Sequence, residues 1–151
     1  MGIKMIRTMT IDDYDMVYDL WMKIKGFAIR SIDDSKEGVA RFLLRNPDTS
    51  VVAVEDDKIV GAILCGHDGR RGCMYHVCVD AEYRLRGIGK AMVVFAMNAL
   101  KKENISKISL IAFSENDIGN AFWNEIGWTQ RLDLNYYDFV LNTANITEFN
   151  K

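Results

Sequence analysis

The sequence predicts a single domain of the α/β or α+β class, in which helices cover both faces of one sheet. Its 151 residues, 49% of them apolar, suit one compact core. Segments with helical periodicity are interspersed with short apolar runs typical of strands. No repeat, linker or low-complexity tract divides the chain, so we expect one domain over residues 1–151.

Four segments have the apolar spacing of amphipathic helices. The first opens at Thr10 and Asp13, which form a capping box with Asp in place of the commoner Glu, and Gly26 ends it. The second ends at Asn46-Pro47, because the residue before a proline avoids helical backbone angles. The predicted helices therefore cover residues 10–25, 35–45, 88–103 and 117–126.

The remaining apolar runs are short, as strands are. Asp56-Asp57 joins two of them in a β-hairpin, and a polar, glycine-bearing turn over residues 66–72 leads into the next strand. Residues 27–33 are expected to form a loop. The predicted strands cover residues 3–9, 50–55, 58–65, 73–79 and 105–113, and a terminal hairpin is predicted over residues 128–140.

Charge and hydropathy exclude several classes of protein. The 19 basic and 21 acidic residues give a formal net charge of −2, whereas proteins that bind nucleic acid usually carry a basic excess. The longest apolar run, Ala91 to Met97, is far shorter than the roughly 20 residues of a spanning helix. Charged residues also interrupt the N-terminal segment, where a secretory signal needs an apolar core. We therefore expect a cytoplasmic protein that contacts neither membrane nor nucleic acid.

The three cysteines, Cys65, Cys73 and Cys78, are odd in number and lack CxxC spacing. Cys73 and Cys78 lie five apart in one predicted strand, so their side chains face opposite sides and cannot pair. We interpret the cysteines as small buried hydrophobes in a reducing compartment, with a nucleophilic cysteine as the alternative. Two histidines and these cysteines offer no zinc-ligand pairing, so no metal is predicted.

The segment Arg84-Leu85-Arg86-Gly87-Ile88-Gly89-Lys90 joins a predicted strand to a predicted helix. Its two glycines let the backbone approach a ligand without Cβ atoms in the way. The first amides of a helix have no partner inside it and lie at the positive end of its dipole, which suits phosphate. Arg84, Arg86 and Lys90 add charge for a diphosphate. Neither a dinucleotide fingerprint nor a Walker A loop fits the spacing, and an ordinary turn with solvated arginines is the alternative.

This segment, read as Arg84-x-x-Gly87-x-Gly89, resembles the acetyl-CoA pyrophosphate loop of the GNAT superfamily of N-acyltransferases. A second match follows the next predicted strand: Asn116, then Trp123 seven residues on, then Gly127-Trp128. The order of predicted elements also corresponds to the family's fold along nearly the whole chain. The resemblance implies a mixed, largely antiparallel central sheet of about seven strands with helices on both faces, and acetyl-CoA as cosubstrate.

The resemblance also implies which residues hold the cosubstrate. The strand before the loop would splay from its neighbour, and the pantetheine arm would pair with its backbone at Val77, Cys78 and Val79. The loop amides would hold the diphosphate, and Asn116 would contact the pantetheine or adenosine part. The implied cofactor-binding residues are Val77, Cys78, Val79, Arg84, Leu85, Arg86, Gly87, Ile88, Gly89, Lys90, Asn116 and Trp123.

The catalytic groups depart from the family's pattern. Many relatives carry, seven residues after the asparagine, a tyrosine that protonates the CoA thiolate. Here Trp123 stands at that position, and an indole N–H is not a practical acid. Tyr136 and Tyr137 are candidate substitutes. The candidate base is His76, because an ordinary histidine titrates near pH 6.5; His67 is a second candidate.

The predicted function is transfer of an acetyl group from acetyl-CoA to a primary amine of a small molecule, amino acid or protein, by direct attack in a ternary complex. The acceptor site would combine residues 27–31 with the His67 turn, and nearby arginines would favour an anionic acceptor. A glutamate of some relatives is replaced by Ile111. A catalytically weak CoA-binding sensor therefore stays open, as does a flavin- or nucleotide-binding module. A homodimer through the C-terminal strands is a further hypothesis.

Overall fold

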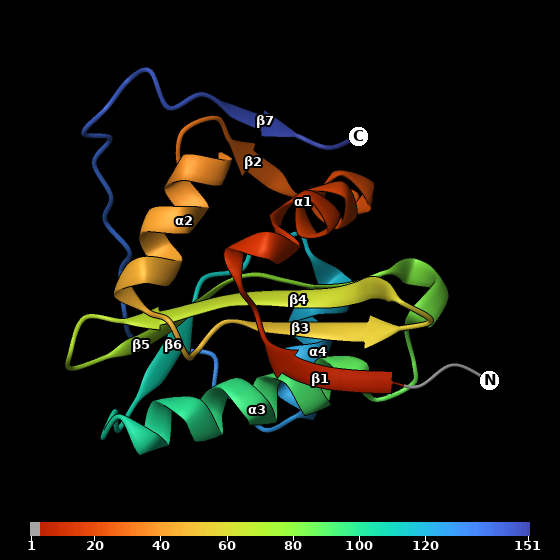
Figure 1. Cartoon of the computed structure of the whole chain (residues 1–151). Helices are drawn as coiled ribbons and strands as arrows, with labels where there is room; N and C mark the ends of the chain where they lie inside the picture. The colour runs from red at the N-terminus through yellow and green to blue at the C-terminus, as the bar shows by residue number, and fades with distance from the viewer. Residues whose placement is uncertain (1–3) are drawn as a thin grey trace.

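A five-stranded mixed sheet with helices on both faces dominates the computed structural model, which describes residues 4–151 (Figure 1). The strand order is β1-β3-β4-β5-β6. The first three neighbouring pairs are antiparallel and β5 with β6 is parallel, which confirms the largely antiparallel sheet. The strands are β1 (Lys4–Thr8), β3 (Val51–Glu55), β4 (Lys58–His67), β5 (Gly72–Val79) and β6 (Ile108–Leu110). Ile3, the first residue of the predicted first strand, lies outside the described residues.

Two further strands, β2 (Ala28–Arg30) and β7 (Thr147–Phe149), form a separate antiparallel sheet. The number of strands in residues 4–151 is thus about the seven expected, but only five belong to the central sheet, and neither β2 nor β7 is among the strands predicted from the sequence. The prediction of a loop over residues 27–33 is wrong, because β2 gains its partner from the other end of the chain, which no local pattern encodes. The predicted terminal hairpin is also wrong: residues 128–140 contain no strand.

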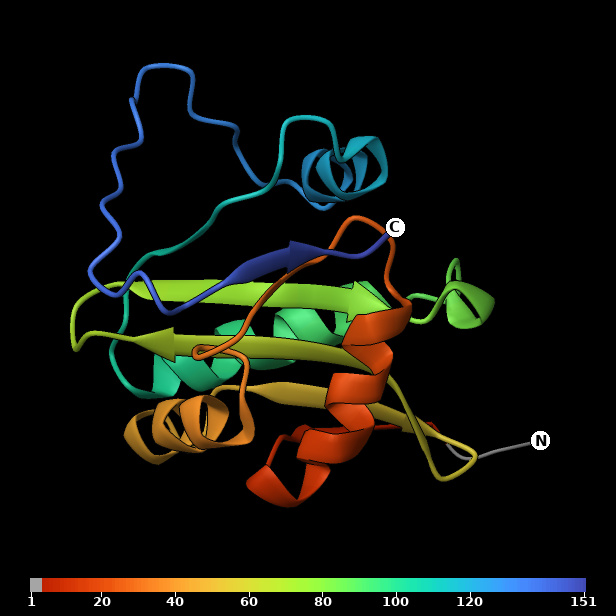
Figure 2. The same ribbon diagram turned by 90° about the horizontal axis from the view of Figure 1, so that it is seen from above.

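The helices occupy both faces of the central sheet, as predicted (Figure 2). Ala62 and Leu64 of β4 pack into the core beneath α1 and α2, whereas Ile63 and Cys65 pack into the core on the α3 side. Both faces of β4 are therefore buried, which explains its continuous apolar sequence. The helices are α1 (Tyr14–Lys23), α2 (Lys36–Arg45), α3 (Ile88–Lys102) and α4 (Asp117–Glu125).

The predicted helix starts are present. Thr10 N donates to the Asp13 carboxylate at 2.9 Å, which completes the capping box. A short 3₁₀ turn, Ile11–Asp13, then leads into α1. The hydrogen bond from Arg7 holds the pKa of Asp13 below its ordinary value. Ser35 caps α2 by accepting from Gly38 N at 3.0 Å.

Residues 128–146, which we call the C-terminal arm, connect α4 to β7 as an irregular extended segment. Figure 2 shows the arm bowing outward from the rest of the molecule before it returns to β7 beside β2. Within residues 4–151, no helix combines the length and apolar character that crossing a bilayer requires.

Candidate functional site

β5 pairs with β6 only over its first three residues, which face the whole of the short β6. The parallel pairs are Gly72–Ile108, Cys73–Ser109 and Met74–Leu110. β5 continues to Val79, whereas the chain beyond Leu110 leaves the sheet toward α4 (Figure 2). In the described part of the chain, residues 75–79 of β5 therefore have no strand partner on that side. The expected splay is present, and residues 77–79 lie along its free edge.

His76 lies at an irregularity within this free stretch. The register pairs Leu64 with Tyr75 and Ala62 with Cys78, so Ile63 faces two residues of β5 across a β-bulge. His76 has a φ of 50°, a left-handed conformation that few residues other than glycine adopt. Strained backbone of this kind is retained where the surrounding structure holds it, and it is common at functional sites.

The imidazole of His76 contacts three groups from the layer that covers the sheet. Its ring centroid lies 4.8 Å from that of Trp21 in α1 and 5.0 Å from that of Phe27. Its Nε2 lies 2.8 Å from Oδ1 of Asp34, and the two side chains are 12% and 5% exposed. Because an ionised carboxylate only accepts hydrogen bonds, this contact favours the proton on Nε2 and leaves the lone pair on Nδ1.

Asp34 is itself held in place. Arg30 N donates to its Oδ2 at 2.6 Å, and the Tyr14 hydroxyl donates to its main-chain oxygen at 2.6 Å. Burial raises the pKa of Tyr14 to about 12, so its hydroxyl stays a donor at neutral pH. Sequence reasoning missed Asp34, because it lies 42 residues from His76 and no motif links the two positions.

The turn over residues 84–90 has free main-chain donors. Gly87 caps α3 with a φ of 78°, which favours glycine. Ala91 N donates to Gly87 O at 3.1 Å, but among residues 4–151 the amides of residues 85–90 find no protein acceptor. Leu85, wholly exposed, also has a positive φ of 64°. These donors, at the positive end of the α3 dipole, suit an anion.

The cationic side chains of the turn make only exposed contacts. The Arg86 guanidinium lies 3.4 Å from Glu55 Oε1 and 5.0 Å from the centroid of the Tyr83 ring. Arg84 Nε donates to Val79 O at 3.2 Å, at the end of the free edge of β5. An exposed ion pair of this length contributes little, so Arg86 can exchange Glu55 for a ligand phosphate at small cost.

Gly89 has a packing role distinct from that of Gly87. A Cβ at Gly89 would lie 3.3 Å from the Phe122 ring of α4. The ring centroid of Trp123 lies 5.0 Å from that of Phe122, in an edge-to-face arrangement, and 4.7 Å from that of Trp128, with the two planes tilted by 48°. The structure thus brings Trp123 into an aromatic cluster against the α3 core.

Asn116 is engaged in the backbone of α4. Its Oδ1 accepts from Gly119 N at 3.0 Å, which makes it the cap of the helix. A Cβ at Gly119 would clash with the Asn116 side chain, so these two residues are matched. The asparagine of the second sequence match therefore has a structural function of its own.

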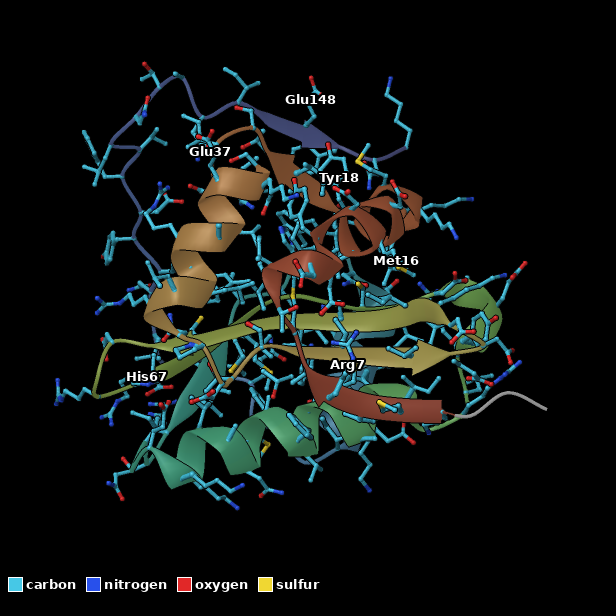
Figure 3. The ribbon with its side chains drawn as sticks, viewed as in Figure 1. Arg7, Met16, Tyr18, Glu37, His67 and Glu148 are labelled. Carbon is cyan, nitrogen blue, oxygen red and sulfur yellow. The ribbon has the colours of Figure 1, made fainter. Side chains whose placement is uncertain are left out.

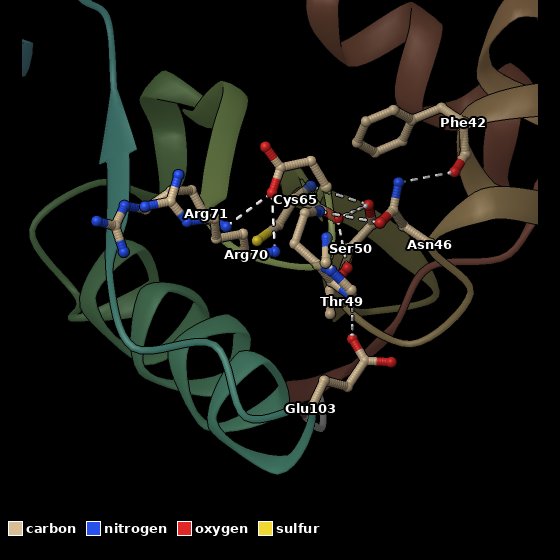
Figure 4. Close-up of polar contacts among 11 residues, drawn as sticks. Phe42, Asn46, Thr49, Ser50, Cys65, Arg70, Arg71 and Glu103 are labelled. Carbon is tan, nitrogen blue, oxygen red and sulfur yellow. Dashed lines mark hydrogen bonds and ion pairs between the residues drawn. The ribbon is translucent and has the colours of Figure 1, made fainter.

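His67 lies at the end of β4, away from α1 (Figure 3). Its Nε2 lies 2.7 Å from Glu103, and its Nδ1 accepts from Gly69 N at 2.9 Å. Since both ring nitrogens are engaged, His67 has no lone pair free for a base. Figure 4 shows the same turn, in which Asp68 accepts from the amides of both following arginines, Arg70 and Arg71, at 2.8 Å. This turn lies at the start of β5, opposite the end that carries residues 77–79.

The buried thiols are poor nucleophiles. Burial raises the pKa of Cys65 and of Cys78 to about 12, so both stay protonated at neutral pH. Among residues 4–151, no three His, Cys, Asp or Glu side chains gather closely enough to hold a metal ion.

Comparison with known proteins places this geometry in a family. The Acetyltransferase (GNAT) family matches residues 14–128. Acetyltransferase SG1711 of Sodalis glossinidius is 33% identical over 136 residues, which is 90% of each chain. Acetyltransferase ECA0875 of Pectobacterium atrosepticum is 32% identical over 135 residues, 89% of this chain and 90% of its own.

A solved structure shares the fold over nearly the full length. The PaiA N-acetyltransferase of Thermoplasma acidophilum, in complex with coenzyme A, superposes with a TM-score of 0.70 at 16% identity and covers 96% of both chains. Sequence and fold agree, and the chain belongs to the GNAT family of acetyltransferases.

Proposed function

We propose that the protein transfers the acetyl group of acetyl-CoA to a primary amine by direct attack of the amine in a ternary complex. The observation that carries this proposal is the free edge of β5 followed by the donor-rich turn at the start of α3. Coenzyme A is present in the structures of the PaiA enzyme and of aminoglycoside N-acetyltransferase AAC(6')-Iy, which share the fold. In the proposal, the amides of residues 85–90 bind the diphosphate and residues 77–79 bind the pantetheine arm.

The acceptor amine must lose a proton. At pH 7, reference pKa values leave about one lysine amine in two thousand neutral, and about one α-amine in ten. In the proposal, Nδ1 of His76 takes the proton directly or through a water, and Asp34 stabilises the resulting imidazolium at Nε2. The C–N bond then forms, the attacking nitrogen releases its second proton to solvent, the C–S bond breaks, and CoA leaves as a thiolate.

The developing oxyanion needs hydrogen-bond donors, and the leaving thiolate needs a proton. Main-chain N–H groups at the bulge of β5 are the proposed donors to the carbonyl oxygen. By analogy with cysteine, the CoA thiol has a pKa of about 8.5, so solvent can protonate the thiolate. Trp123 is not assigned a proton, because an indole does not act as an acid at neutral pH.

An open hollow of about 400 Å³ lies between α1, β2 and the start of α2. Asp34 lines the hollow and also contacts Nε2 of His76, so this carboxylate links the hollow to the proposed base. Its volume suits an amino acid or the end of a peptide. Two cations, Arg30 and Lys36, line it together with two carboxylates, Asp15 and Asp34. We infer that the acceptor carries a carboxylate or phosphate near its amine, so that each of its charges meets an opposite one.

The test is an assay of thiol release from acetyl-CoA over a panel of amines, with products identified by mass. The panel pairs amino acids with their amides, so that each pair differs only in the anionic group. We expect turnover with at least one primary amine and a preference for the anionic member of each pair. Tight CoA binding without turnover would support the CoA-binding sensor instead. Equal rates for the two members of each pair would exclude a requirement for an anionic group on the acceptor.

We also propose that the C-terminal arm forms a homodimer interface. Seven of its apolar residues are between 61% and 94% exposed: Leu132, Leu134, Tyr136, Tyr137, Phe139, Val140 and Leu141. Soluble monomers rarely expose contiguous apolar surface of more than a few hundred Å². Because α4 and β7 tether the two ends of the arm, the same arm of a second copy is the surface that matches it in length and apolar pattern.

Light scattering during size exclusion is expected to give twice the chain mass of 17.2 kDa. Replacing Phe139 and Leu141 with lysine should give the monomer, because the charges would be buried between the arms. Asp138→Lys is the matched control on the same segment and should leave the dimer intact. A parent protein that is monomeric at every concentration excludes the interface.

We infer a cytoplasmic location from the cysteines. Cys65, Cys73 and Cys78 are free thiols in the structure. Thiols persist in reducing compartments, whereas secreted domains commonly oxidise theirs to disulfides.

A further inference from the structure

The C-terminal strand is tied to the connection between α1 and α2 at both of its ends. At one end, Asn150 N donates to Phe27 O at 2.9 Å, and Asn150 O accepts from Gly26 N at 2.9 Å. At the other end, Asn145 Oδ1 accepts from Ile32 N at 2.9 Å. Figure 1 shows β7 lying beside β2, above α1 and close to the end of the chain. Residues 145–150 are thus part of the layer that covers the sheet.

The side chain of Asn150 also closes α1. Its Nδ2 donates to Trp21 O at 2.8 Å and to Ile24 O at 2.9 Å. Trp21 O also accepts from Ile24 N at 3.1 Å and Ile24 O from Phe27 N at 3.4 Å, so the Asn150 amide adds a second, shorter hydrogen bond to each carbonyl. Asn150 therefore holds both the end of α1 and the turn that follows it.

These two segments carry the aromatic rings against His76. Trp21 is in the last turns of α1 and Phe27 is in the turn, and Asn150 hydrogen-bonds to the main-chain oxygen of each. The third group, Asp34, depends on the same strand pair, because Arg30 pairs with Thr147 of β7 and donates its N–H to Asp34. Each contact of the His76 ring with this layer is therefore braced by β7.

We propose that Asn150 is a positioning residue for His76. The inference rests on the proposed role of His76 as the base. Without the Asn150 amide, the end of α1 and the Phe27 turn can separate, and the imidazole loses its fixed orientation toward the acceptor amine. A displacement of about 1 Å in such a group can lower the rate about a hundredfold. The diphosphate turn makes no contact with Asn150 among the described hydrogen bonds, so CoA affinity is spared.

The kinetic test compares Asn150→Ala with Glu148→Ala. Glu148 is in β7, two residues before Asn150, and its side chain points into solvent (Figure 3). We expect Asn150→Ala to lower kcat by about ten- to a hundredfold, with calorimetric CoA affinity unchanged, and Glu148→Ala to match the parent. In a His76→Asn background, Asn150→Ala should add no further loss. If the fold-loss in kcat of the double variant equals the product of the losses of the two single variants, Asn150 acts independently of His76 and the inference is overturned.

A second readout does not depend on acetyl transfer. The imidazole signals of His76 and His67 are followed by NMR through a pH titration of ¹⁵N-histidine-labelled protein. Asn150→Ala should move the ring signals of His76 and leave those of His67 unchanged. Unchanged His76 signals would overturn the inference even in an active enzyme, whereas shifted signals would uphold the contact in a protein without acetyltransferase activity. Should Asn150→Ala not fold, Asn150→Asp keeps the size and removes both donors.

Discussion

Replacing His76 with asparagine is expected to lower kcat/KM for acetyl transfer by about a hundred- to a thousandfold, the range of a lost general base. Asparagine is the suitable substitute because it tolerates the positive φ of 50° at this position better than most residues, so the bulge can persist. The hydrogen bond to Asp34 then no longer aligns a proton acceptor with the amine. The rate of acetyl transfer to a fixed amine gives the measurement.

The pH profile separates this effect from a general loss of packing. The parent rate should fall as the pH drops, because a protonated imidazole cannot accept the proton of the amine. The variant should lose the part of this fall that belongs to the imidazole, so that its rate follows the neutral fraction of the amine alone, and it should keep its CoA affinity. His67→Asn is the matched control, since that ring is engaged by Glu103 and Gly69, and it should behave as the parent. A His76→Asn protein with the parent's rate and pH profile would remove His76 from the mechanism.

Reversing both charges in the variant Arg86→Glu, Lys90→Glu is expected to weaken CoA binding by about a hundredfold or more. A hydrogen bond to a charged group contributes about 1.5–3 kcal/mol, and about 1.4 kcal/mol is a tenfold change in affinity. The contacts of Arg86, at 3.4 Å with Glu55 and 3.3 Å with Glu82 O, are long and exposed, so the fold itself should survive the exchange. Isothermal calorimetry with CoA is the direct measurement.

The control for this variant lies at the other end of the same helix. Lys101 and Lys102 are exposed in the last turn of α3, and Lys101→Glu, Lys102→Glu makes the same change in net charge far from the turn. It should bind CoA as the parent does. Added salt should weaken binding to the parent more than to the reversed variant, because screening acts on the attraction that the variant lacks. Unchanged affinity in the Arg86→Glu, Lys90→Glu protein would refute the diphosphate turn and, with it, the proposed function.

Local chemistry accounts for the features that the sequence predicts correctly. Ser35 caps α2 because its hydroxyl reaches an amide three residues on, within the same turn. Asp56 and Asp57 adopt positive φ values of 53° and 61°, as a two-residue hairpin of this kind requires. Gly87 marks the turn into α3 for the same conformational reason. Each of these preferences depends on only a few neighbouring residues, so it can be recognised in the sequence without knowing the rest of the fold.

Contacts between residues that are far apart in the sequence cannot be predicted from local preferences. Nothing in residues 27–33 predicts β2, because its backbone groups are satisfied by β7 at the far end of the chain. The apolar alternation of residues 128–140 is typical of a hairpin, yet these residues form the extended C-terminal arm. Backbone hydrogen bonds of a strand come from another segment, so the strand exists only where the fold supplies that segment.

The amino-acid sequence by itself determined the helices, the β3–β4 hairpin, the glycine turn at α3 and the membership in an acyltransferase family. The tertiary structure alone decided that β5 separates from β6 after Met74 and that His76 meets Asp34, Trp21 and Phe27. It also decided that Asn150 braces these partners from the end of the chain. The physical reason is that capping and turn preferences are properties of short segments, whereas a buried polar pair forms only when packing removes both groups from water and leaves each the other as partner.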